Sequence, residues 1–143
     1  MLSQPDIAAL LITLKLAGTT TLILILFGTP LAWWLATTRS KARSAIEAVI
    51  ALPLVLPPTV LGFYLLLSFS PDGPIGATTS ALGLPSMAFS FWGLVIGSAI
   101  YSLPFVVQPL QNSFAGLGRM QLEAAATLGA GPLDRFISVV LPL

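Results

Sequence analysis

Three long apolar segments, separated by short polar connections, dominate the pattern of this chain. They cover about residues 7–36, 48–70 and 90–107. Roughly 20 apolar residues suffice to cross about 30 Å of hydrocarbon. A segment inside lipid must be helical, because each backbone polar group needs an internal partner there. The pattern therefore predicts an all-α, polytopic membrane protein with three complete transmembrane helices, and residues 136–143 begin a fourth apolar segment.

Composition supports the membrane class and argues against catalysis. The chain is 56% hydrophobic and 8% charged, whereas soluble domains are about 25% charged. Its net charge of +1 lacks the basic face that nucleic-acid binding requires. Cysteine and histidine are both absent, which removes disulfides, the usual zinc sites and the commonest general base. We therefore expect no enzyme activity, no catalytic residue, no metal and no cofactor.

The distribution of basic residues predicts the orientation in the membrane. The connection at residues 39–43 carries three basic residues, and the polar stretch 108–135 carries two, whereas the connection 71–89 carries none. Basic loops stay on the cytoplasmic side, so we expect the N-terminus and the 71–89 connection outside. Lys15 then lies near the outer surface, where its long stem lets the ammonium group reach the headgroups.

The second apolar segment is rich in residues that break helices. Pro53, Pro57, Pro58 and Gly62 all lie within it. Proline lacks a backbone donor and crowds the preceding turn, so a kinked or broken helix is expected. Broken backbone at membrane depth is tolerated where protein or a water-filled cavity satisfies it. One interpretation is that this segment lines a translocation path, with Pro57, Pro58, Gly62 and Tyr64 as the path residues. The alternative is a kinked packing helix.

The connection that begins at Pro71 is built of turn-forming residues from Pro71 to Ser80. Such a loop is either a simple connector or a contact surface for an extracytoplasmic partner.

A polar, charged stretch at about residues 117–142 interrupts the apolar pattern near the end of the chain. An apolar stripe runs through it at helical spacing, at Leu117, Met120, Ala124 and Leu128. Gly129 suits the left-handed position that ends a helix, and Pro132 suits the first turn of the next. The stretch therefore predicts two short helices at the membrane surface. They either rest on the headgroups or dock a soluble partner.

The spacing within this stretch resembles the EAA loop of ABC-importer permeases. The matching residues are Glu123-Ala124-Ala125, Gly129, Val139 and Leu141-Pro142, with valine where the usual pattern has isoleucine. The resemblance implies the fold of type I importer permeases (MetI-like), with residues 1–143 as a partial transmembrane domain. It also implies that the loop is a cytoplasmic coupling helix, whose Glu123, Ala124, Ala125 and Gly129 contact a separate ATPase.

The second segment narrows this resemblance to the molybdate permeases. The run Leu52–Leu66 is similar to the LPLVLPPxVxG(F/Y)LLL run of that subfamily, and residues 73–76, 88–91 and 126–131 also resemble it. The resemblance implies a homodimeric permease in the bacterial cytoplasmic (inner) membrane that imports molybdate. It also implies two partners, the ABC ATPase subunits that hydrolyse ATP and a periplasmic or extracytoplasmic molybdate-binding protein. Tungstate and sulfate, which are similar tetrahedral dianions, are the alternative cargoes.

Permeases of this family continue through further membrane spans beyond the EAA loop. Residues 136–143 would form about 12 Å of helix, too short to cross a bilayer, so we expect this chain to be the N-terminal portion of a permease. One alternative is a truncated membrane protein that docks the ATPase without transporting. Another is an unrelated small membrane scaffold in which the spaced motif is a coincidence.

Overall fold

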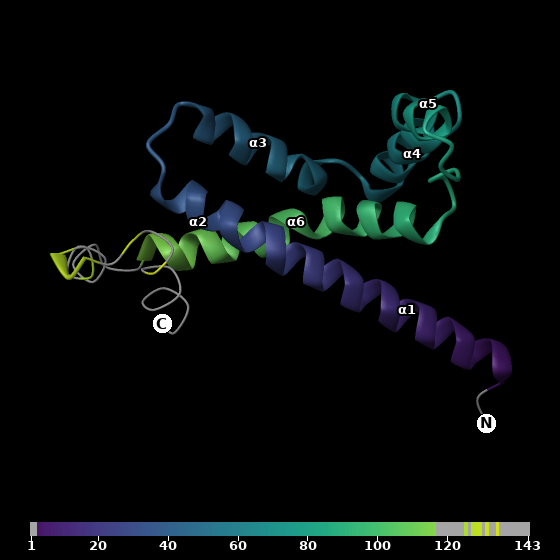
Figure 1. Cartoon of the computed structure of the whole chain (residues 1–143), viewed down its shortest axis with the longest axis horizontal. Helices are drawn as coiled ribbons and strands as arrows, with labels where there is room; N and C mark the ends of the chain where they lie inside the picture. The colour runs from purple at the N-terminus through teal and green to yellow at the C-terminus, as the bar shows by residue number, and fades with distance from the viewer. Residues whose placement is uncertain (1–2, 117–124, 126, 130, 132–133, 135–143) are drawn as a thin grey trace.

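The computed structural model of the chain describes residues 3–116, 125, 127–129, 131 and 134. Within that part the regular structure is entirely helical, which confirms the all-α prediction (Figure 1). The elements in chain order are α1 (Gln4–Ile23), a π-helical turn (Leu24–Gly28), α2 (Thr29–Thr37), α3 (Ala42–Val55), α4 (Pro58–Phe69), α5 (Pro74–Ala81) and α6 (Phe91–Gly116).

The first apolar segment forms one helical rod from Gln4 to Thr37, with the π-helical turn in its interior. Its start is defined by Asp6, whose carboxylate accepts a hydrogen bond of 2.8 Å from the backbone N–H of Ser3. The wider turn at Leu24–Gly28 lies just before Pro30, whose missing N–H and bulky ring disturb the preceding turn. The rod of 34 residues is about 51 Å long, enough to cross a bilayer in a tilted orientation.

The second apolar segment is broken, as its prolines predict. Helix α3 ends at Val55, α4 begins at Pro58, and the chain bends by 111° at this break. Pro57 and Pro58 have no N–H to continue the ladder of α3. Pro53, by contrast, is accommodated inside α3. The predicted range 48–70 therefore contains two differently oriented helices rather than one straight span.

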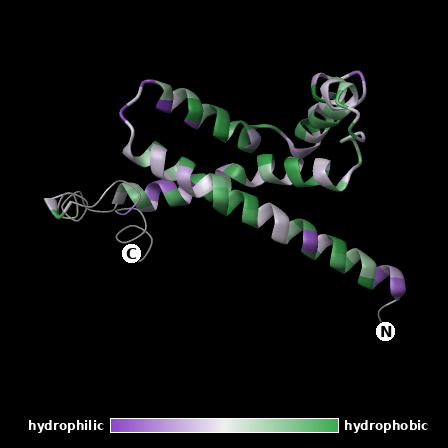
Figure 2. Cartoon of the chain, in the orientation of Figure 1, coloured by the Kyte–Doolittle hydropathy of each residue, from purple (hydrophilic) through white to green (hydrophobic). Residues whose placement is uncertain are grey.

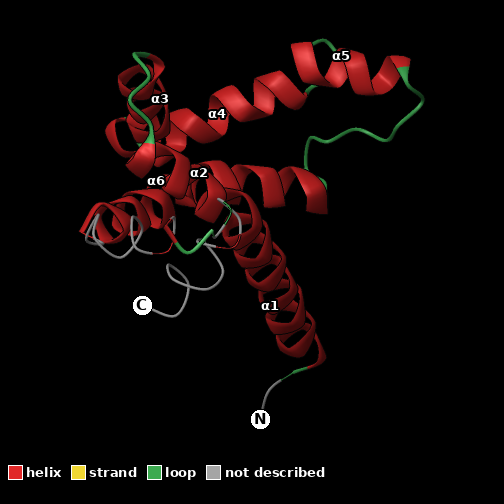
Figure 3. Ribbon diagram, turned by 60° about the vertical axis from the view of Figure 1, so that its left-hand side comes forward, coloured by secondary structure: helices red, strands yellow, loops and turns green. Residues whose placement is uncertain are grey.

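The connection that begins at Pro71 contains a helix that its turn-forming composition did not predict. Helix α5 lies against the end of α4 (Figure 3). A side chain on Gly73 would collide with the carbonyl oxygen of Leu67, and one on Gly76 with that of Ser70. These two glycines let the backbone fold back closely on α4, and α5 then begins at Pro74, a favourable first position.

The hydrophobic core lies where α2, α3 and α6 meet. Its buried members are Ala32 and Leu35 of α2, Ile50 of α3 and Val107 of α6. Trp33 and Phe114 pack edge to face beside it, with ring centroids 5.5 Å apart. Helix α6 continues past residue 107, the expected end of the third span, to Gly116.

Most other large apolar side chains point outward, and Figure 2 shows hydrophobic residues along much of α1 and α6. In the described part of the chain, two helical stretches are long and apolar enough to cross a membrane, Gln4–Thr37 and Phe91–Gly116. They become three if the bent pair Ala42–Val55 and Pro58–Ala81 counts as one broken span. The predicted start of a fourth span lies outside the described residues.

Candidate functional site

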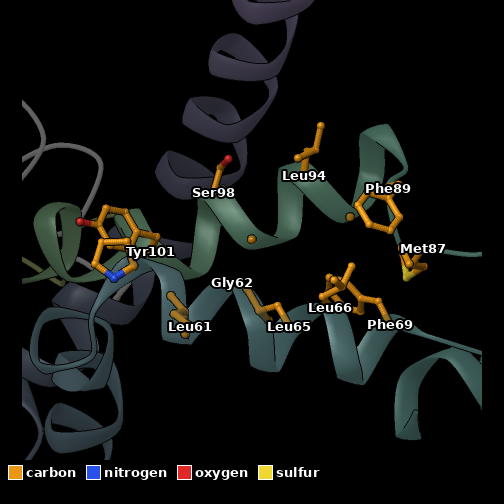
Figure 4. A pocket seen from close by; sticks show the side chains of 14 residues that line it. Leu61, Gly62, Leu65, Leu66, Phe69, Met87, Phe89, Leu94, Ser98 and Tyr101 are labelled. Atoms are coloured by element: carbon orange, nitrogen blue, oxygen red, sulfur yellow. The ribbon is translucent and has the colours of Figure 1, made fainter. Parts of the chain in front are cut away.

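A pocket of 510 Å³ lies between α4 and the first half of α6. Figure 4 shows α4 along one side and α6 along the other, with Phe89 and Met87 near one end and Tyr101 near the other. Its lining comprises Pro58, Leu61, Gly62, Leu65, Leu66, Phe69, Met87, Ala88, Phe89, Gly93, Leu94, Gly97, Ser98 and Tyr101.

Glycines on both helices shape this pocket. A Cβ atom on Gly62 would meet nothing within 4 Å, so this position of α4 faces open space. On α6, a Cβ atom on Gly97 would lie 3.5 Å from Cδ1 of Leu65, in ordinary contact across the pocket. A side chain on Gly93 would collide with the carbonyl oxygen of Met87. The segment before α6 can therefore close one end of the pocket only because residue 93 is glycine.

The pocket lining is neutral. None of the described residues that line it is charged, and its polar side chains are those of Ser98 and Tyr101. Moving an ion from water into apolar surroundings without a partner is costly. A surface of this kind can bound a path for a hydrated solute, but by itself it provides no tight binding site for an ion.

The structure brings two of the four predicted path residues to this pocket. Pro58 and Gly62 line it. Pro57 lies at the break just before α4. Tyr64 is 59% exposed and packs edge to face with Phe63 at a centroid distance of 6.0 Å, away from the pocket lining.

Sequence reasoning missed the α6 side of the pocket. Gly93, Gly97 and Tyr101 recur every four residues and so share one helix face. This spacing of two glycines and one aromatic hydroxyl was the signal available in the sequence. Ser98 lies beside the same face, but nothing in the sequence alone distinguishes it from other helical serines.

Phe89 stands at one end of the pocket in an unusual backbone conformation. Its φ angle is 56° and its side chain is 90% exposed. A bulky residue in the left-handed region costs about 1–2 kcal/mol. The exposed ring is thus held at the pocket end by the segment that joins α5 to α6.

Of the predicted coupling residues, Glu123 and Ala124 lie outside the described residues. Ala125 is helical, and Gly129 lies in the following turn with a φ angle of +83°. This angle confirms that Gly129 ends a helix in the left-handed conformation. A Cβ atom there would meet nothing within 4 Å. The requirement for glycine at this corner is therefore conformational rather than steric, and its contact with an ATPase stays a prediction.

The chain matches a protein family over most of its length. The family described as "Binding-protein-dependent transport system inner membrane component" matches residues 28–143. The matched range includes the broken second segment, the pocket and the predicted coupling residues.

Three relatives share a single description, "Molybdenum transport system permease protein ModB". The protein from Azotobacter vinelandii is 61% identical over 142 residues, which is 99% of this chain and 63% of that protein. The protein from Escherichia coli K12 is 34% identical over 143 residues, covering 100% of this chain and 62% of the relative. The protein from Mycobacterium tuberculosis is 39% identical over 135 residues, covering 94% and 51%. The chain thus spans between half and two thirds of the length of these relatives.

Proposed function

Because the chain belongs to the family of binding-protein-dependent transport system inner membrane components, we propose that it acts in a permease subunit that imports molybdate across the bacterial cytoplasmic membrane. The observation that carries this proposal is the 61% identity to the Azotobacter molybdenum permease over 99% of the chain. The neutral pocket beside a broken helix supports a role in passage rather than storage of the anion.

The proposed path runs along the pocket between α4 and α6. Pro58 and Gly62 contribute its α4 side, Pro57 provides the break, and Tyr64 faces outward toward a neighbouring subunit. A dianion needs polar groups or water on every side, and this pocket supplies two hydroxyl groups. We therefore propose a homodimer in which a second copy completes the path, while an external binding protein selects the anion.

The energy source in this proposal is a pair of separate ABC ATPase subunits on the cytoplasmic side. Glu123, Ala124, Ala125 and Gly129 are the proposed contact residues for the ATPase. The left-handed turn at Gly129 supports this role, because it gives the segment a sharp corner that a cleft in a partner can recognise. ATP hydrolysis then occurs on the partner, and this chain carries the movement into the membrane.

The proposed orientation has the N-terminus outside. The basis for this orientation is the distribution of basic residues, with three at residues 39–43 and none at residues 71–89. The Lys15 ammonium lies 5.0 Å from the centroid of the Phe91 ring, so the part of α1 around Lys15 and the start of α6 lie on the same side of the membrane. Such a contact holds a cation beside an aromatic face. Phe91 opens α6 directly after the outer connection, so Lys15 lies near the same level and can reach the outer headgroups.

The orientation can be tested by cysteine labelling, since the chain contains no native cysteine. We expect Ser80→Cys, at the exposed end of α5, to react with a membrane-impermeant maleimide in intact spheroplasts. Ser40→Cys, in the exposed basic connection, should react only after the membrane is permeabilised. Labelling of Ser40→Cys in intact spheroplasts, with Ser80→Cys protected, would show the opposite orientation.

The function itself is tested by anion uptake in cells. Deleting the gene should abolish high-affinity uptake of labelled molybdate, and expressing the complete reading frame should restore it. Competition with unlabelled tungstate and sulfate then identifies the cargo. A protein that assembles with the ATPase but restores no anion uptake would support the docking-only alternative instead.

A further inference from the structure

A polar contact joins α3 to α6 at their cytoplasmic ends in the proposed orientation. One carboxylate oxygen of Glu47, Oε1, accepts a hydrogen bond from Nε of Arg43 at 2.8 Å and another from Nε2 of Gln111 at 2.5 Å. Arg43 lies one helical turn before Glu47 on α3, whereas Gln111 lies 64 positions away on α6. The contact therefore connects two separate helices through one atom.

Apolar packing continues this connection toward the core. Ile46 and Ile50 of α3 lie in the same cluster as Val107 and Leu110 of α6. Val107, one turn before Gln111, is fully buried. The polar contact thus stands at the edge of a packed interface, which limits how freely the two helices can move apart.

The two joined helices lead to opposite walls of the pocket. Helix α6 runs without interruption from the pocket residues Gly93 and Gly97 to Gly116, immediately before the proposed coupling segment. Helix α3 reaches the pocket indirectly, through the 111° break at Pro57 into α4. A movement of the coupling segment therefore acts on one wall directly through α6. The same movement acts on the α4 wall only to the extent that α3 moves together with α6.

We propose that Glu47 is a positioning residue that makes α3 follow α6, so that movement of the coupling segment changes the pocket between α4 and α6. This inference rests on the proposed function, specifically on ATPase docking at residues 123–129. The hydrogen bond from Arg43 fixes the position of the Glu47 carboxylate on α3. The hydrogen bond from Gln111 transmits the movement of α6 to this carboxylate. The break at Pro57 supplies the joint at which α4 turns relative to α3, because neither Pro57 nor Pro58 can donate a ladder hydrogen bond.

The most informative variant exchanges the residues at positions 47 and 111, the two hydrogen-bonding partners on α3 and α6. Glu47→Ala and Gln111→Ala each remove the contact. The double variant Glu47→Gln/Gln111→Glu restores it, because the new glutamine can accept from Arg43 and donate to the new carboxylate. Gln108→Ala is the matched control, since Gln108 is exposed on the same helix one turn earlier. All variants are made in the complete gene product, assembled with its ATPase and binding protein in proteoliposomes.

The first readout is the amount of molybdate transported per ATP hydrolysed. We expect each alanine variant to lower this ratio by about fivefold or more, while ATP hydrolysis persists. The exchange variant should recover most of the ratio, and Gln108→Ala should match the unmodified protein. Unchanged ratios in both alanine variants, or an exchange variant as impaired as the single variants, would overturn the inference.

A second readout separates this inference from the proposed function. Single cysteines at the exposed positions Ser44 on α3 and Ser113 on α6 carry an environment-sensitive dye, which reports the response of each helix to ATP. In the unmodified protein both dyes should respond, and in Glu47→Ala only the dye at position 113 should. Equal responses of both dyes in Glu47→Ala contradict the proposed role of Glu47 but do not contradict the proposed function. A response at neither position in the unmodified protein contradicts ATPase coupling, and this inference with it.

Discussion

Replacing Gly129 with valine is expected to lower molybdate uptake by about 5–30-fold while ATP hydrolysis by the partner continues. The φ angle of +83° at Gly129 is disfavoured for residues with a Cβ atom by about 1–2 kcal/mol, and a β-branched residue tolerates it least. A penalty of this size lowers the ratio of the native corner to its alternative conformations by a factor of about 5–30, and uptake falls by the same factor where the alternatives then predominate. Uptake and ATPase rates in the assembled complex provide the measurement.

The chain offers a matched control two residues later. A Cβ atom on Gly131, as on Gly129, would meet nothing within 4 Å, but only Gly129 has a positive φ angle. Gly131→Val should therefore keep at least half of the uptake rate. A surface substitution of this kind typically changes the free energy of unfolding by a few tenths of a kcal/mol, which corresponds to a factor of about two. Equal uptake in both variants would show that the left-handed corner at Gly129 is unimportant for coupling.

Replacing Gly62 with leucine is expected to reduce uptake by roughly tenfold or more, the effect of about 1.4 kcal/mol on a barrier. Gly62 lines the pocket, and a Cβ atom there would meet nothing within 4 Å. Leucine is also a better helix former than glycine, so α4 should remain folded. The expected defect is therefore obstruction of the path, measured as a lower maximal uptake rate at unchanged protein abundance.

Gly18→Leu is the control for this second substitution. Gly18 is also helical and also has open space at its Cβ position, but it lies on an exposed face of α1, away from the pocket. We expect normal uptake from this variant. If Gly62→Leu transports as well as Gly18→Leu does, the pocket between α4 and α6 is not the path.

The features that could be predicted from sequence are those with local causes. The break after Val55 follows from two consecutive prolines, whose missing donors act within a few residues. The left-handed Gly129 follows from a glycine placed after a helical apolar stripe. The three apolar segments follow from residue composition alone, because lipid allows few alternatives to the helix.

The features that were not predicted have two kinds of cause. Some depend on contacts between distant residues, and others on local choices, such as helix against turn, that the sequence alone does not decide. Helix α5 forms in a segment of turn-forming residues because Gly73 and Gly76 allow it to pack closely on α4. Helix α6 continues through Pro104 and Pro109, where packing of Val107 against α2 and α3 retains the helix. The pairing of Glu47 with Gln111 joins positions 64 residues apart, and no local pattern specifies such a partner.

On one wall of the candidate pocket, sequence reasoning singled out two residues, Pro58 and Gly62, and their role in a translocation path stays a prediction. They were singled out because proline and glycine are residues that break helices; in the structure Pro58 begins α4, whereas Gly62 lies inside α4 without interrupting it. The opposite wall, with Gly97 and Tyr101, was missed because its residues are ordinary in a membrane helix until α4 is packed beside them.

Uptake of labelled molybdate into proteoliposomes is the decisive experiment for the proposed permease function. The complete gene product, its ATPase and its binding protein are reconstituted in vesicles. ATP is supplied in the compartment that the ATPase faces. We predict molybdate uptake that requires both ATP and the binding protein and that excess sulfate does not abolish. A correctly assembled complex that hydrolyses ATP but accumulates no molybdate, with or without the binding protein, would contradict the proposed function.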